Sequence, residues 1–211
     1  MPKLHAAPIT PPRQKRSQDT LEALLRASQR LLATKAFRDV TINDIVREAG
    51  SSSGSFYARF ADKNALLHAL HERFAERARE QARQLTASID TDDLRIEDVT
   101  LILMRELVRT HAANRGVLRA ALMEALVDAR FVDRVVELTR DVARAITPLL
   151  QASRAPHPMT RARVETGVQT VLAVLDQDLF LGAESARGAA SPRARRRPEW
   201  LAKIFRTAIE P

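Results

Sequence analysis

The segment from Thr41 to Lys63, TINDIVREAGSSSGSFYARFADK, constrains the fold of this chain more than any other. It reads as two short helices joined by a glycine turn and followed directly by the start of a third. Thr41 is a suitable N-cap, and Asp44 occupies the capping-box position three residues later. Gly50 stands where the end of a helix favours a left-handed residue, and Ser52 is suited to cap the next helix.

The second of these helices is short and does not resemble a core helix. Ser53, Gly54 and Ser55 are small and polar, while Tyr57 and Arg59 carry hydrogen-bonding tips. A helix with a small, polar first turn suits the major groove of DNA, where large apolar residues would be of no use. The pattern therefore predicts a helix-turn-helix.

The stretch from Leu21 to Leu70 resembles the DNA-binding domain of the TetR family of bacterial transcriptional regulators. The resemblance rests on LEALLRASQRLLATKAF, TINDIVREAG, SSSGSFYARF and DKNALL, which follow the order of the family pattern. Ala36 stands at a usual glycine, Ser51 at a usual valine and Arg59 at a usual histidine. The match covers about a quarter of the chain, and it says little about any ligand.

Residue chemistry and the resemblance assign the same roles in this segment. Tyr57 and Lys63 offer a hydroxyl and an ammonium to phosphate oxygens, and Thr41 offers an amide and a hydroxyl. Ser53, Ser55 and Arg59 are candidates for base edges, since arginine reads guanine. The alternatives are a packed aromatic ring for Tyr57 and a solvated cap for Lys63. The predicted DNA-binding residues are Thr41, Ser53, Ser55, Phe56, Tyr57, Arg59 and Lys63.

The positive charge of the chain is concentrated in two places. The formal net charge is +8, and residues 1–63 hold 11 Lys/Arg against 6 Asp/Glu. The stretch 187–197 adds five arginines and no acid. This distribution predicts a phosphate-binding end on a nearly neutral body. An arginine-rich composition with no functional meaning is the alternative explanation.

Apolar residues recur at helical spacing along the rest of the chain, and no stretch alternates like a β-strand. We therefore expect an all-α fold of about nine helices, with an N-terminal three-helix helix-turn-helix domain and a C-terminal helical bundle. Pro148 should kink or restart its helix. The expected helices beyond the motif run from Ser17 or Asp19 to Thr34, from Asp62 to about Thr86, from Ile96 to Ala113, from Gly116, from 131 to 149, from Thr160 to Leu181 and from Pro198.

Three regions are expected along the chain. Residues 1–16, with four prolines, form a flexible basic arm whose Arg13, Lys15 and Arg16 contact phosphates or enter a minor groove. The alternative is an arm that is merely disordered. Residues 17–65 form the DNA-binding domain, and residues 66–211 form an effector-binding and dimerisation domain.

The resemblance implies an effector cavity enclosed by the central helices and a dimer interface formed by the last two. Aliphatic lining predicts an apolar or amphipathic effector. Five polar side chains interrupt apolar helix faces, and they are either anchors for the effector or ordinary solvated or paired residues. They are Glu106, His111, Glu124, Gln169 and Asp176. The candidate effector residues are Leu103, Met104, Leu107, His111, Met123 and Val171. The candidate interface residues are Val168, Leu172, Leu175, Leu179, Trp200, Ile204 and Phe205.

Several kinds of chemistry are not indicated. The chain has no cysteine, which removes disulfides and thiolate sites. His68 and His71 are three apart on one helix, but no further ligand is spaced to complete a metal site. There is no glycine-rich phosphate loop or nucleophile elbow. No membrane span or signal peptide is indicated either. We expect a cytoplasmic protein that is not an enzyme and has no metal and no cofactor.

Together these features predict a homodimeric, ligand-responsive transcriptional regulator, most simply a repressor. Its partners would be a pseudo-palindromic double-stranded DNA operator and an unknown small-molecule effector. Effector binding would shift the population away from the operator-binding state. The first alternative is a constitutive basic DNA-binding protein without an effector. The second is a small helical enzyme.

Overall fold

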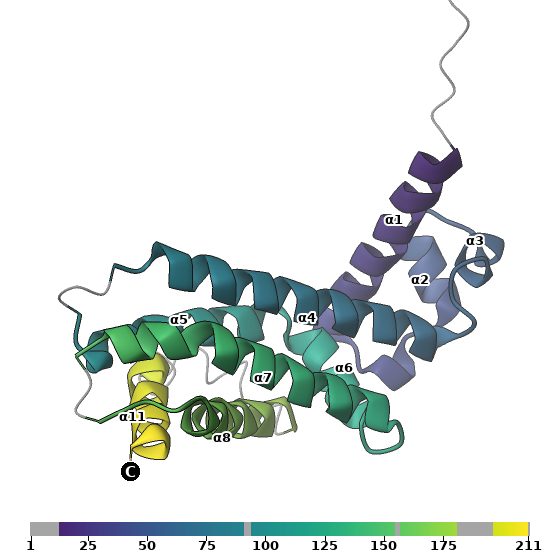
Figure 1. Ribbon diagram of the computed structural model, residues 1–211. Coiled ribbons are helices and arrows are strands. Elements are labelled where there is room, and N and C mark those ends of the chain that lie inside the picture. Colours follow the sequence, from purple (N-terminus) through teal and green to yellow (C-terminus); the bar gives the residue numbers. More distant parts are fainter. Residues whose placement is uncertain (1–12, 91–93, 155–156, 181–195, 211) are drawn as a thin grey trace, which may run out of the picture. The chain divides into compact units, whose positions relative to one another are not determined.

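The computed structural model of the protein describes residues 13–90, 94–154, 157–180 and 196–210. Over these residues the chain forms nine α-helices and one 3-10 turn, and the only strand-like feature is an isolated bridge between Arg95 and Arg154 (Figure 1). The all-α prediction is confirmed. The helices are α1 (Arg13–Thr34), η1 (Phe37–Asp39), α2 (Ile42–Glu48), α3 (Ser53–Tyr57), α4 (Lys63–Ser88), α5 (Ile96–Ala113), α6 (Arg115–Glu124), α7 (Ala129–Ala152), α8 (Arg161–Phe180) and α11 (Arg197–Ile209).

The chain divides into two compact units, Met1–Leu66 and Leu67–Pro211. In the first unit α2 packs against both α1 and α3. The apolar side chains of this unit occur at the helical spacing seen in the sequence. Leu25 of α1, Ile45 of α2 and Phe56 of α3 are buried. This small core fixes the positions of α2 and α3 on α1.

The core of the second unit lies where α5, α7, α8 and α11 meet. Its side chains are almost all aliphatic, and Val99, Leu150, Val171 and Phe205 are fully buried within it. Helix α11 packs against α8 and α5 (Figure 1). The two helices pack tightly at Gly167 of α8, where an added Cβ would lie only 2.7 Å from Cγ2 of Ile209 on α11.

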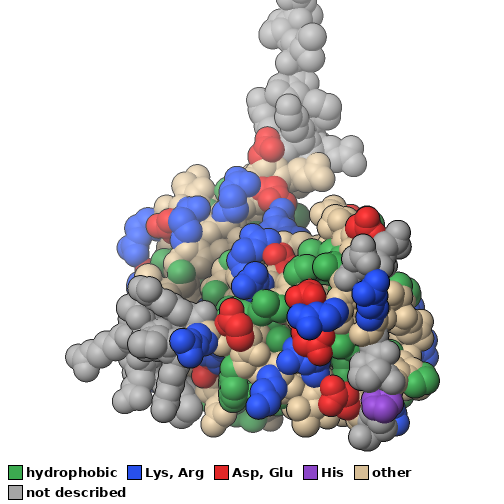
Figure 2. Space-filling view, turned by 90° about the vertical axis from the view of Figure 1, so that its left-hand side faces the viewer, with side chains coloured by type: hydrophobic (Ala, Val, Ile, Leu, Met, Phe, Trp, Pro, Cys, Tyr) green, Lys and Arg blue, Asp and Glu red, His purple; other side chains and the backbone are tan. Residues whose placement is uncertain are grey.

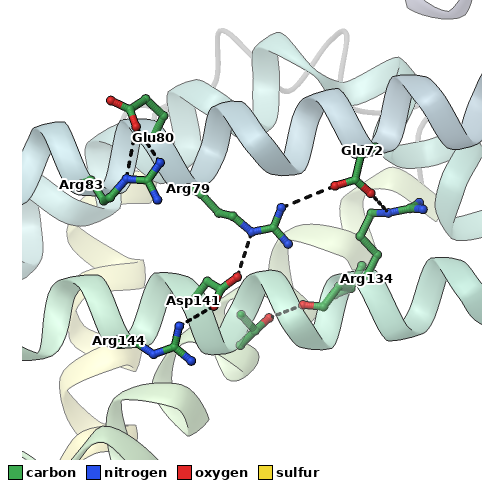
Figure 3. Close-up of polar contacts among 9 residues, drawn as sticks. Glu72, Arg79, Glu80, Arg83, Arg134, Asp141 and Arg144 are labelled. Atoms are coloured by element: carbon green, nitrogen blue, oxygen red, sulfur yellow. Dashed lines mark hydrogen bonds and ion pairs between the residues drawn. The ribbon is translucent and has the colours of Figure 1, made fainter.

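Ion pairs connect α4 with α7 along one side of the second unit (Figure 3). Nε of Arg79 lies 2.9 Å from Oδ2 of Asp141, and Nη1 of Arg79 lies 3.6 Å from Oε1 of Glu72. Nε of Arg134 lies 2.6 Å from the other oxygen of Glu72. Single exposed pairs contribute little, but a linked set holds the two helices in one register.

Helix α7 continues through Pro148. It runs without interruption from Ala129 to Ala152, so of the two expected effects of the proline, a kink or a restart, the restart does not occur. Pro148 is exposed, and it has no N–H for the carbonyl of Arg144. Helix α1 also begins at Arg13, earlier than either predicted start, and α6 ends at Glu124.

The surface of the second unit carries both signs of charge. On the face that Figure 2 shows, Lys and Arg side chains are interspersed with Asp and Glu, with apolar side chains between them. Within the described ranges, none of the helices combines the length and apolarity that a bilayer crossing requires. The expected basic arm, up to residue 12, and Arg193 to Arg195 of the arginine run lie outside the described residues.

Candidate nucleic-acid interface

The turn between α2 and α3 is the glycine turn expected from the sequence. Gly50 has a φ of 60°, the left-handed conformation that favours glycine. The amide of Ser51 donates to the carbonyl of Val46 at 2.8 Å, and the amide of Gly50 donates to that of Arg47 at 3.2 Å. These two bonds form a Schellman motif, which ends α2 and sets the direction of α3.

Helix α3 presents a small and mostly uncharged surface to solvent. Ser53, Gly54 and Ala58 are exposed, and the side chain of Tyr57 is 58% exposed. Ser52 caps the helix, since its Oγ accepts from the amide of Ser55 at 3.2 Å. The outer face of this helix therefore offers hydroxyls, a methyl group and one phenol ring.

Phe56 is not part of that face. It is completely buried and packs against Tyr57 and Phe60, with ring centroids 5.5 Å away in both cases. The prediction that Phe56 contacts DNA is wrong, because residue 56 faces the core of the unit. Ser55 is half-buried, and its hydroxyl accepts from that of Ser52 at 3.1 Å.

The guanidinium of Arg59 turns back toward α1 instead of pointing outward. Its Nη2 donates to the carbonyl of Ser17 at 3.0 Å and to the hydroxyl of Ser17 at 3.2 Å, and Nε lies 3.3 Å from the same carbonyl. Nη1 donates to the carbonyl of Ser55 at 2.7 Å. The predicted role of Arg59 as a reader of base edges does not fit this arrangement. Ser17, which lies 42 residues away, was not among the predicted site residues.

Lys63 is also directed inward. Its ammonium donates to the carbonyls of Phe37 at 2.8 Å and Val40 at 2.9 Å, and it lies 4.4 Å from the centroid of the Phe37 ring. These contacts fasten the start of α4 to the chain between α1 and α2. The ammonium keeps one N–H for another acceptor, so the predicted phosphate contact is at most a secondary role.

Thr41 is engaged by an acidic side chain. Oδ2 of Asp44 accepts from the amide of Thr41 at 3.1 Å and from its hydroxyl at 2.9 Å. The bond from the Thr41 amide, and then that from its hydroxyl, holds the pKa of Asp44 below its ordinary value. The carboxylate thus occupies both donors that were assigned to a phosphate. Arg47, whose Nη2 lies 2.6 Å from the other oxygen of Asp44, is mostly exposed beside them.

Of the seven predicted residues, Ser53 and Tyr57 are the ones whose side chains are exposed and make no hydrogen bond or ion pair to the other described residues. Asp44 and Arg47 were missed as members of this surface. The capping-box spacing signals Asp44, and nothing in the local sequence signals the pairing of Arg59 with Ser17.

The six candidate effector residues do not share one accessible cavity. Leu103, Met104 and Val171 are buried in the core of the second unit, and Leu107 packs against it. His111 is buried with its Nε2 3.4 Å from Oδ1 of Asp176, whereas Met123 is 48% exposed. An open cavity of about 370 Å³ lies instead between the ends of α4 and α7. It is lined by Thr86, Ala87, Ile89, Ala145, Pro148, Leu149 and Ala152.

The candidate dimer residues fall into two groups. Val168, Leu175, Leu179 and Phe205 are buried within their own chain, so their assignment to an interface is wrong. Val168 and Leu175 of α8 and Phe205 of α11 pack in the core of the second unit. Leu172 and Ile204 are half-buried, and Trp200 is 52% exposed. Phe180, the last residue of α8, is 55% exposed.

His68 and His71 belong to a polar cluster at the start of α7. Nε2 of His68 lies 2.8 Å from Oδ2 of Asp128, and its ring stacks on Phe131 at 4.1 Å. Nδ1 of His71 lies 3.2 Å from Nη1 of Arg134. Burial, followed by repulsion from Arg134, lowers the pKa of His71 to about 4. Because Arg134 can only donate, His71 is neutral and accepts this bond.

Comparison with known proteins finds a family match to this part of the chain. Residues 24–70 match the sequence profile of the bacterial regulatory proteins, tetR family. Over these residues the chain has the sequence pattern of the TetR family. This match agrees with the sequence resemblance, and it supports the expectation that the chain is not an enzyme, since the matched proteins are regulators.

Two curated relatives match about a third of this chain. The HTH-type transcriptional regulator EthR of Mycolicibacterium smegmatis is 38% identical over 72 residues, which are 32% of this chain and 33% of that protein. The uncharacterized HTH-type transcriptional regulator YvdT of Bacillus subtilis is 36% identical over 58 residues, or 28% of this chain and 30% of that protein. The match thus spans about a third of the length of these curated relatives.

Solved structures extend the likeness of fold to nearly the whole chain. A tetR-family transcriptional regulator from Streptomyces coelicolor superposes with a TM-score of 0.65 at 17% identity, covering 92% of this chain and 80% of that one. GusR of Salmonella enterica gives a TM-score of 0.64 at 16% identity, with 96% and 99% covered. At such identities the likeness shows the fold alone.

Proposed function

We propose that this chain is a transcriptional regulator that binds a specific double-stranded DNA site through α3. The observation that carries the proposal is the Schellman turn at Gly50, which connects α2 to a short helix whose outer face is small, polar and exposed. A helix with that surface can lie in a major groove without steric conflict. The family match over residues 24–70 supports the same function.

Phosphate contacts would position α3 in the groove. The hydroxyl of Tyr57 is the most accessible of the predicted phosphate donors, since the amide and hydroxyl of Thr41 are held by Asp44. Arg38 and Arg47 add exposed positive charge to the same unit. Such contacts supply affinity and register without sequence information.

The protein would act as a homodimer that responds to a small molecule. Phe180 on α8 and Trp200 on α11 are exposed, large apolar side chains that a second copy would cover. The aliphatic character of the core between α5, α7 and α8 favours an apolar or amphipathic effector that would release the protein from its operator. As a regulator of chromosomal genes the protein would work in the cytoplasm.

The proposal is tested by selecting DNA that the full chain binds from a library of randomised duplexes. The expected result is one pseudo-palindromic sequence bound at least about 1000-fold more tightly than bulk DNA at physiological salt. Mass spectrometry of the purified protein under native conditions would show whether a small molecule is bound. Binding to all duplexes with equal affinity would instead support the constitutive DNA-binding alternative.

Tyr57→Phe tests the phosphate contact in the same assay. Loss of one hydrogen bond to a charged oxygen should weaken binding to operator and bulk DNA alike by roughly tenfold. The preferred sequence should stay the same, because the phenyl ring remains. The dependence of affinity on salt should also stay the same, since no charge is removed. A change of preference at one base pair would show that the hydroxyl reads a base.

A further inference from the structure

The chemistry of the exposed face of α3 limits which bases it can recognise. Guanine is read best by Arg or Lys, adenine by Asn or Gln, and cytosine by Asp or Glu. None of these residue types occurs between Ser52 and Ala58. Serine hydroxyls can bond to any base edge and therefore specify little.

Arg59, the nearest long polar side chain, is half-buried and bonded to other residues of its own unit. Three of its contacts go to Ser17 on α1 and one goes to the carbonyl of Ser55 on α3, as described above. All three guanidinium nitrogens are engaged in this way. Moving Arg59 into a groove would leave the carbonyl of Ser55 without this donor and release the link between α3 and α1. Arg59 is therefore a positioning residue for the recognition helix.

The other exposed groups on the outer face of α3 are suited to contact a methyl group of the DNA. Ala58 presents its own methyl to solvent, and the half-exposed ring of Tyr57 lies one residue before it. Gly54, one helical turn before Ala58, has no side chain, so the backbone can approach a base pair closely there. Only thymine carries a methyl group in the major groove, and small apolar side chains and aromatic rings recognise it.

We propose that α3 recognises its half-site through the 5-methyl groups of thymines, contacted by Ala58 and the ring of Tyr57. The segment of the operator under α3 is then rich in A·T pairs. Arg59 positions α3 and contacts no base. This inference rests on the proposed function and specifies the chemistry of the same surface.

The test uses the selected operator and replaces each thymine under α3, one at a time, by deoxyuridine, which lacks the methyl group. Each contacted position should lose about fourfold in affinity, the effect of exposing one methyl-sized apolar group. Thymines outside the half-sites provide the control and should show no loss. A half-site without sensitive thymines would overturn the inference.

Variants identify the protein side of the contact. In Ala58→Gly the penalty for deoxyuridine should disappear at one position of each half-site, because the partner methyl is gone from the protein. Ala61→Gly, which also removes an exposed methyl but lies beyond α3, should leave the penalty unchanged. A deoxyuridine penalty that persists undiminished in Ala58→Gly would remove Ala58 from the contact.

Arg59→Ala separates positioning from reading. It should weaken binding to every sequence while the preferred base at each position stays the same. If Arg59 reads a base, the selected half-site will contain a guanine whose preference is lost in this variant, and the inference fails. If the wild-type chain selects no sequence at all, the proposed function itself fails.

Discussion

Residue-level contacts make parts of this protein sensitive to acid, and His71 is the clearest case. Its ring is buried among Arg134, Glu72, His68 and Phe131, and its pKa is lowered to about 4 from an ordinary value of 6.5. The unfolded chain therefore binds a proton at a higher pH than the folded chain does. The stability that depends on neutral His71 is complete above pH 6.5 and is lost as the pH falls toward 4.

We therefore predict that the free energy of unfolding decreases by about 2 kcal/mol between pH 7 and pH 4.5 on account of His71. His71→Gln keeps an acceptor for Arg134 but does not titrate. Over the same pH range, the free energy of unfolding of this variant should therefore fall by about 2 kcal/mol less than that of the wild-type protein. Urea denaturation followed by circular dichroism at both pH values measures the difference. Equal pH dependence in the two proteins would contradict the assignment.

Single residues of the site were predictable from sequence only where their partners are local. The Thr41–Asp44 capping box and the turn at Gly50 follow from spacings of a few residues. The inward orientation of Arg59 depends on Ser17, and that of Lys63 depends on carbonyls near residue 40. Tertiary contacts of this kind leave no periodic signal, so both side chains were predicted to face DNA.

At the level of elements, the contact between α8 and α11 depends on Gly167. An added Cβ would lie 2.7 Å from Cγ2 of Ile209 and 2.9 Å from the ring of Phe205, and both side chains are fully buried. Gly167→Ala should therefore lower the free energy of unfolding by about 1–3 kcal/mol through overpacking, despite the higher helix propensity of alanine. Thr166→Ala, on the exposed side of the same helix, should change it by less than about 0.5 kcal/mol. Thermal and urea denaturation measure both, and a stabilised Gly167→Ala would show that α11 can move aside.

Apolar periodicity was enough to predict where the helices lie in the sequence. It could not predict which element packs against each apolar face. Val168, Leu175 and Leu179 repeat at helical spacing, which shows that one side of α8 is covered. The same spacing results whether the cover is another copy of the chain or α11 and α7 of its own chain. The structure has the second arrangement, since α11 and α7 both pack against α8. Pro148 likewise suggests a restart of the helix, but α7 is continuous through it.

For the whole molecule, the proposed paired reading of DNA depends on association of two chains. Replacing two leucines of α8 by arginine, in Leu172→Arg with Leu175→Arg, is not a clean test of this association. Leu175 is buried, so its replacement would disrupt the fold. Phe180 and Trp200 are more than half exposed, so Phe180→Glu with Trp200→Glu should leave the helices intact. Two carboxylates at the centre of an apolar interface would prevent dimer formation.

The expected result is a folded monomer by sedimentation, with helical content unchanged by circular dichroism. Its affinity for the full operator should fall by about 100-fold or more toward that of a single half-site, because the second half-site no longer binds at high effective concentration. Leu126→Glu with Val127→Glu provides the matched control, since these side chains are 74% and 83% exposed on the turn before α7. If this control dissociates the dimer and the first variant does not, the interface lies at the turn between α6 and α7. A monomer that keeps full operator affinity would contradict paired reading, whichever surface joins the chains.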